Sequence, residues 1–252
     1  MRAVLSIILG LLVMAHGAVA AEYDRPKLFL GSAGPDASRA DYAAISLGLG
    51  IVDLTFGRPR SAIDDPTFSG PGLSLAQPRS RVALAAEQDQ LGAGILIETK
   101  PLLGLSFSSS VHGGEQTEET YVAVTGRYTT PDVRQIGQIA VFGGAETDGE
   151  EDVFRLGTSL TRGPAVAGFD VTSETGPSER RIAGVFIGLD VNEALSLAIS
   201  SEVEQDAEGE EQPARFGVGA SYSFGRNQTV SGAIGDVTGE EPRFGFMLGL
   251  QF

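Results

Sequence analysis

The sequence predicts an all-β fold, a transmembrane antiparallel up-and-down β-barrel, from three observations. Apolar side chains alternate with small or polar ones along many segments. Turn sequences separate these segments at regular intervals, and no useful helical period follows residue 20. Because a strand sends successive side chains to opposite faces, each such segment has one apolar face and one small or polar face. The last segment shows the pattern most clearly, with apolar residues at Phe244, Phe246, Leu248, Leu250 and Phe252.

Residues 1–20 have the pattern of a secretory signal peptide. Arg2 gives a basic start, residues 3–14 form an apolar run, and Ala18-Val19-Ala20 offers a small-x-small cleavage site. The apolar run is short for a membrane anchor, although a retained N-terminal anchor is the alternative interpretation. We therefore expect an exported chain in which residues 21–252 form one barrel domain in the outer membrane.

Composition excludes several classes of protein. The chain has no Cys and a formal net charge of −15, so it lacks disulfides and would repel nucleic acid. No apolar stretch of about 18 residues follows the signal peptide, which leaves strands as the means of crossing a bilayer. No His or Cys cluster predicts a metal site, and we expect no cofactor.

The period-2 pattern gives about 12 strands, each close to the length of a tilted membrane crossing. RVALAAEQ at 81–88 and KLFLGS at 27–32 could be two more strands, for an alternative count of about 14. The parity of 134–144 is ambiguous, because Ile136 and Phe142 alternate out of phase with Ile139 and Val141. The expected strands are 43–56, 89–99, 103–112, 118–129, 134–144, 153–162, 165–174, 180–190, 194–203, 214–224, 228–236 and 243–252.

Short turns alternate with longer, acidic connectors, which is typical of barrels with short periplasmic turns and longer external loops. A soluble sandwich would also alternate, but Gly and Ser fill the non-apolar face here and charges are sparse within the strands.

The signal peptide, the strands and a terminal Phe resemble the porin-like outer-membrane β-barrels of Gram-negative bacteria. The resemblance implies outer-membrane lipid and lipopolysaccharide around the barrel. It also implies recognition by the barrel assembly machinery through Leu248, Leu250 and Phe252.

Charged residues on the small or polar face are the candidate pore-lining residues. Opposite charges on a narrow lumen wall select small polar solutes or ions, or pair with each other and close the lumen. The longest connector, around 57–80, carries Arg58, Arg60 and Arg79 and is the best candidate to fold inward. The predicted pore-lining set is Glu98, Lys100, Arg127, Arg155, Asp170, Asp190, Glu202, Arg215 and Arg243.

The acidic clusters at 146–152 and 202–211 have two interpretations. They are solvated loops, or they form a mouth that attracts cations or bridges divalent ions to lipopolysaccharide. His112 follows Ser108, Ser109 and Ser110, but a single loop His without a nucleophile motif does not predict an enzyme. We therefore expect no catalytic residues.

Two functions remain open. The first is an outer-membrane, porin-like channel for passive diffusion of small hydrophilic solutes or ions, with a preference for cations. The alternative is a closed barrel that serves as a structural or adhesion protein of the outer membrane.

Overall fold

The chain folds into a closed barrel of 14 antiparallel strands, each paired with its neighbours in sequence, and β1 pairs with β14 to close the ring. The computed structural model describes residues 23–34, 42–88, 90–115, 119–134, 136–176, 179–224, 228–237 and 242–252. The predicted signal peptide, 1–20, lies outside these residues. The strands are β1 (Tyr23–Gly34), β2 (Tyr42–Leu49), β3 (Val52–Arg58), β4 (Leu91–Thr99), β5 (Leu105–Gly114), β6 (Thr120–Thr129), β7 (Gln138–Thr147), β8 (Asp152–Arg162), β9 (Ala165–Thr175), β10 (Arg180–Asp190), β11 (Leu195–Asp206), β12 (Arg215–Ser223), β13 (Gln228–Val237) and β14 (Arg243–Gln251).

The alternative strand count is confirmed, and the additional strands have two origins. KLFLGS lies within β1, as the sequence suggested. The expected strand 43–56 is instead two strands, because Gly50, with φ of 72°, turns the chain back between β2 and β3. The outward apolar residues change parity at this turn, from Leu47 and Leu49 in β2 to Phe56 in β3.

RVALAAEQ is not a strand. Residues Arg81–Glu87 form helix α3, whose first turn is capped by Ser80, where the Oγ accepts a hydrogen bond from the Ala83 N–H. A Ser at the N-cap followed by Ala and Leu favours a helix. The run is too short for its apolar periodicity to distinguish a helix from a strand.

The apolar face of the barrel points outward, as predicted. Along β10, Val185 and Ile187 are each 58% exposed, while Ile182 and Phe186 are buried on the opposite face. The ambiguous segment 134–144 follows the same rule. Ile139 and Val141 point outward from β7, Phe142 points inward, and Ile136 lies in the turn before the strand.

The two ends of the barrel differ. Connectors 50–51, 100–104, 163–164 and 191–194 lie at one end, called the turn end, where β6 and β12 also end and β7 and β13 begin. The other end, called the loop end, carries the long connector between β3 and β4 and the connector 207–214. Strands β5, β7 and β11 extend further toward the loop end than the sequence suggested, and the connector 148–151 between β7 and β8 is short.

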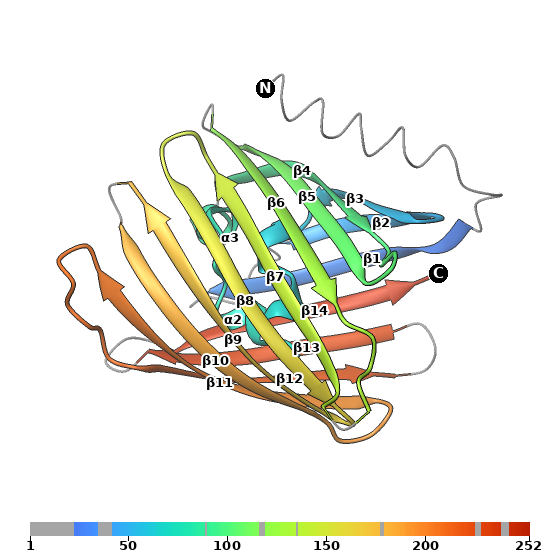
Figure 1. The fold of residues 1–252 in the computed structure, drawn as a ribbon. Helices are drawn as coiled ribbons and strands as arrows, with labels where there is room; N and C mark the ends of the chain where they lie inside the picture. Colours follow the sequence, from blue (N-terminus) through green and yellow to red (C-terminus); the bar gives the residue numbers. More distant parts are fainter. Residues whose placement is uncertain are drawn as a thin grey trace.

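Residues 59–88, called the inward segment, fold into the barrel, as predicted for this connector (Figure 1). The segment contains η1 (Ala62–Asp64), η2 (Pro66–Phe68), α2 (Leu73–Ala76) and α3. η1 packs on β5–β7, η2 on β8, and α2 on β11–β14 and β1. Glycines on the inward face make room for this packing, since a Cβ at Gly219 would collide with the Pro71 carbonyl oxygen.

Candidate functional site: the barrel interior

Arg155 of β8 holds the middle of the inward segment. Its Nε lies 3.0 Å from Asp170 Oδ2 on β9, and the same guanidinium donates to the Ile63 carbonyl at 2.9 Å and to Ser69 Oγ at 2.7 Å. Arg155 is 3% exposed and Asp170 is 4% exposed. A buried guanidinium with a carboxylate and several acceptors is well satisfied, so this contact fixes η1 and η2 against the wall.

An aromatic contact supports the same region. The rings of Phe68 in η2 and Phe142 in β7 are stacked, with centroids 4.2 Å apart and an interplanar angle of 4°. The Arg155 guanidinium carbon lies 5.8 Å from the centroid of the Phe68 ring. Stacking and cation–π contact both add to the burial of these rings.

Arg79 joins the later part of the inward segment to β9 and β11. It forms buried ion pairs with Glu202 and, at 3.7 Å, with Asp170. The Arg79 backbone N–H donates to Asp64 Oδ1, and Ser80 Oγ donates to Asp64 Oδ2. Burial raises the pKa of Asp64 above its usual value, against the hydrogen bonds from Ser80 and Arg79 that lower it.

Glu146 of β7 binds the start of α3. It accepts hydrogen bonds from the backbone N–H groups of Arg81 and Val82 and from Ser61 Oγ. At the loop end, Arg81 also pairs with Asp148 at 3.2 Å and with Glu151 at 2.5 Å. Acidic side chains of the barrel wall and of the adjacent loop therefore bind the beginning of α3, both at its backbone N–H groups and at the Arg81 side chain.

A cavity of about 230 Å³ remains between the inward segment and the opposite wall. Arg60 of the inward segment borders it and pairs with Glu98 of β4 at 3.0 Å. The surrounding strands are β1–β4, β13 and β14, and the side chains that line the cavity are both apolar and polar. They include Phe29, Tyr42, Thr55, Leu96, Thr229 and Met247.

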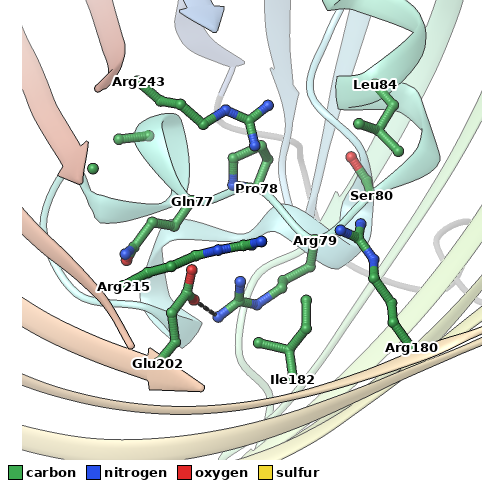
Figure 2. A pocket seen from close by; sticks show the side chains of 12 residues that line it. Gln77, Pro78, Arg79, Ser80, Leu84, Arg180, Ile182, Glu202, Arg215 and Arg243 are labelled. Atoms are coloured by element: carbon green, nitrogen blue, oxygen red, sulfur yellow. Dashed lines mark hydrogen bonds and ion pairs between the residues drawn. The ribbon is translucent and has the colours of Figure 1, made fainter. Parts of the chain in front are cut away.

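Two more cavities lie near the ends of the barrel. One of about 630 Å³ lies at the turn end and is lined by Ser106, Arg127 and Gln138. The other, of about 20 Å³, lies near the loop end, where Arg79, Arg180, Arg215 and Arg243 surround it (Figure 2).

The structure brings several of the predicted pore-lining residues into contact with inward neighbours. Arg155 pairs with Asp170, Glu98 pairs with Arg60, and Glu202, Arg215 and Arg243 line the 20 Å³ cavity. Arg127 borders the cavity at the turn end. Lys100 and Asp190 lie exposed at the turn-end rim, where Asp190 accepts a hydrogen bond from Ser196. The predicted set therefore lies at several separate places in the barrel.

Two expectations about polar residues are wrong. His112 lies in β5 and is fully buried, with Nε2 2.8 Å from the Pro59 carbonyl oxygen, so it supports the inward segment and is not a loop residue. Glu146, Glu202 and Glu204 are buried in strands and bind inward groups, so their clusters are not solvated loops throughout. Glu208, Glu210 and Glu211 are exposed, as a solvated loop requires.

Sequence reasoning noted Arg79 in this connector but did not predict the contacts that hold the inward segment in place. Asp64, Arg79 and Ser80 form one buried network, and Arg180 completes the arginine cluster. The available signal was the concentration of Arg in a connector between two strands. The partners of this segment on the wall are distant in the sequence, 38 residues for Arg60 and Glu98 and 85 for Ser61 and Glu146, and periodicity does not specify such pairs.

Within the described part of the chain, no group of three or more His, Asp or Glu side chains is placed to hold a metal ion. No helix among the described residues has the length and apolar character needed to cross a bilayer.

No family model and no curated protein matches the sequence. Solved structures do match the fold. A loop-deletion mutant of OmpT, an outer membrane protein of Vibrio cholerae, is 10% identical with a TM-score of 0.56, and the match covers 92% of this chain and 99% of that one. A mutant of the Rh. blastica porin is 12% identical with a TM-score of 0.51, covering 92% and 100%. The KdgM porin is 13% identical with a TM-score of 0.50, covering 64% and 91%. The chain thus has the fold of porin-like outer-membrane β-barrels.

Proposed function

We propose that the protein is a non-enzymatic outer-membrane channel for passive diffusion of small hydrophilic solutes or ions, with a preference for cations. The observation that carries this proposal is the 230 Å³ cavity beside the inward segment. The inward segment packs mainly on β5–β8 and β11–β14, so it narrows the lumen from one side. The path for solutes runs along the opposite wall, past Arg60 and Glu98.

The preference for cations rests on the balance of charge. Most interior guanidiniums among the described residues have carboxylate partners, such as Arg155 with Asp170 and Arg215 with Glu204. The exposed acidic residues Glu208, Glu210 and Glu211 then dominate the field at the loop end, within a chain of net charge −15. A negative potential at a mouth raises the local concentration of cations.

Conductance in planar bilayers tests the path. Thr229→Trp would place a large ring in the cavity, whereas Ile234→Trp adds the same ring on the outward face of the same strand. We expect stable stepwise openings of the wild-type protein, a lower conductance for T229W and no change for I234W. Equal conductance of the two variants would contradict this path.

The same measurement separates the channel from a closed structural or adhesion barrel. A folded protein that produces no openings would support the closed barrel. The observation that favours this alternative is that the inward segment fills part of the lumen. Deleting residues 61–77 should increase conductance, since this part occupies the interior. If the deletion variant folds and its conductance is unchanged, the inward segment does not restrict the channel.

Ion preference has its own test. Changing Glu208, Glu210 and Glu211 to Lys leaves the buried carboxylates intact and reverses the charge of the exposed loop. We expect the reversal potential in a KCl gradient to shift toward anions. An unchanged reversal potential would refute the role of this loop.

The surroundings of the barrel follow from its outward face. We propose that outer-membrane lipid and lipopolysaccharide cover the exposed apolar side chains, and that the barrel assembly machinery recognises the last strand. In β14, Leu248 and Leu250 are opposite Leu30 and Leu28 of β1, and Phe252 is 66% exposed at the turn end.

A further inference from the structure

Four arginines converge near the loop end from four separate parts of the chain. Arg180, Arg215 and Arg243 are the first residues of β10, β12 and β14, alternate strands that all begin at the loop end. Arg79 reaches the same place from the inward segment. Figure 2 shows the four guanidiniums directed toward a shared space, the cavity of about 20 Å³.

Several nitrogen atoms in this cluster are buried and have no hydrogen-bond acceptor among the residues that the structure describes. They are the Nε atoms of Arg79, Arg180 and Arg215 and the Nε2 of Gln77, which also lines the cavity. Arg79 is 6% exposed and Gln77 is 9% exposed. Buried donors in proteins nearly always have an acceptor, so four orphaned donors around one cavity indicate a bound acceptor.

The carboxylates nearby are already engaged. Terminal guanidinium nitrogens pair Arg79 with Glu202, Arg215 with Glu204 at 2.6 Å, and Arg180 with Glu174 at 2.7 Å. Arg243 pairs with Glu87. Of these carboxylates only Glu202 lines the cavity, whereas all four guanidiniums do. Together with Asp170, which also pairs with Arg79, these carboxylates balance the guanidinium charge of the cluster as a whole. The lining itself has four guanidiniums and one carboxylate, so its orphaned donors favour an anion over water as the acceptor.

We propose that this cavity is a binding site for a small monovalent anion of the size of chloride. A cavity of this volume holds about one water-sized particle, which excludes large organic anions. The bound anion joins Arg79 of the inward segment to β10 and β12, and so holds the inward segment against the wall. The site shares no lining residue with the 230 Å³ cavity, and its existence does not depend on the proposed channel activity.

Bromide, which replaces chloride and scatters anomalously, locates the site directly. We expect an anomalous peak within hydrogen-bond distance of the Arg79 and Arg215 guanidiniums in crystals of the full chain soaked in bromide. Density there that is only water, with no anomalous peak, would overturn the proposal.

Thermal unfolding in detergent gives an independent measurement. At constant ionic strength, chloride should raise the unfolding temperature in a saturable manner, while gluconate, which is too large for the cavity, should not. Loss of one charged donor in Arg215→Gln should weaken chloride binding about tenfold or more. Arg181→Gln, on the exposed side of β10, is the matched control and should keep the wild-type affinity.

Arg215→Gln leaves the carboxylate of Glu204 without its 2.6 Å partner and risks a folding defect. The double variant R215Q/E204Q removes both charges and keeps the test valid. A chloride effect of equal size in R215Q, or R215Q/E204Q, and in R181Q would show that chloride acts elsewhere, and would contradict the site.

Discussion

Arg155 and Asp170 face each other inside the barrel, with Nε 3.0 Å from Oδ2, and the same guanidinium holds two points of the inward segment. The pair joins neighbouring strands β8 and β9, and the remaining hydrogen bonds of Arg155 reach the inward segment. Arg155 thus couples the stability of the barrel wall to the position of the inward segment, which narrows the lumen.

Replacing Arg155 tests this coupling. Arg155→Met leaves Asp170 buried with only the more distant Arg79, so we expect a loss of about 3–5 kcal/mol in the free energy of unfolding, as for broken buried pairs. R155M/D170N removes both charges and should recover part of the loss. Arg162→Met, at the exposed end of the same strand, is the control. Urea unfolding in detergent measures all three, and equal losses in R155M and R162M would contradict the interpretation.

Acid should release the beginning of α3 through Asp148. Burial raises the pKa of Asp148, but the hydrogen bonds from the N–H groups of Glu151 and Glu150 and from Arg81 outweigh it and lower the pKa below its usual 3.8. A carboxyl with a lowered folded-state pKa stabilises the fold above its unfolded pKa and loses this contribution as pH falls through the folded pKa. The contact with Arg81 should therefore weaken below about pH 3.8.

Labelling of an introduced thiol measures this release, because the chain has no Cys of its own. Leu84→Cys reports on α3, and its labelling rate is divided by that of the unfolded variant at the same pH, because the reactive thiolate becomes scarce in acid. We expect this ratio to increase, relative to pH 6, as the pH falls below about 3.8. Acid also protonates other carboxylates of the chain, so the comparison with L84C/D148N isolates Asp148. If the two proteins show the same pH profile, Asp148 does not hold α3.

The outward face gives a prediction about the membrane. Ile187 lies within β10 and is 58% exposed on the apolar face. A Lys in this position on a lipid-facing strand should cost about 2–4 kcal/mol near the bilayer midplane and less near the interfaces. Folding into vesicles should therefore suffer more from Ile187→Lys than from Leu189→Lys, which is on the same face and next to the turn-end terminus of β10. Equal yields of folded protein from the two variants would argue against lipid contact at this depth.

Local periodicity made the barrel predictable, whereas the interior depends on long-range pairs. Alternation along β10 or β14 specifies which face is apolar, and the Arg-rich composition of the β3–β4 connector indicated an inward position. The turn at Gly50 was missed because the alternation of Ile45, Leu47 and Leu49 continues through Ile51 without a break. Only the change of parity at Phe56 reveals it.

The contents of the lumen were less predictable for a physical reason. The sequence shows small residues on the non-apolar face, and near Gly249 the room beside such a residue belongs to the 230 Å³ cavity. At Gly219 and Gly245 the space is instead filled by Pro71 and Leu75 of the inward segment. A sequence shows that a side chain is small, but it does not show which distant residue occupies the room.

Gly219 supplies the sharpest test of this packing. A Cβ there would collide with the Pro71 carbonyl oxygen, which is backbone and cannot rotate away, so Gly219→Ala must displace the inward segment. Overpacking of this kind costs about 1–3 kcal/mol, and we expect a comparable loss in the free energy of unfolding together with greater labelling of L84C. Gly232→Ala on the adjacent strand is the matched control, because its nearest neighbour would be an oxygen at an ordinary 3.5 Å. Equal stability of G219A and G232A would show that α2 does not pack against β12 as closely as the structure places it.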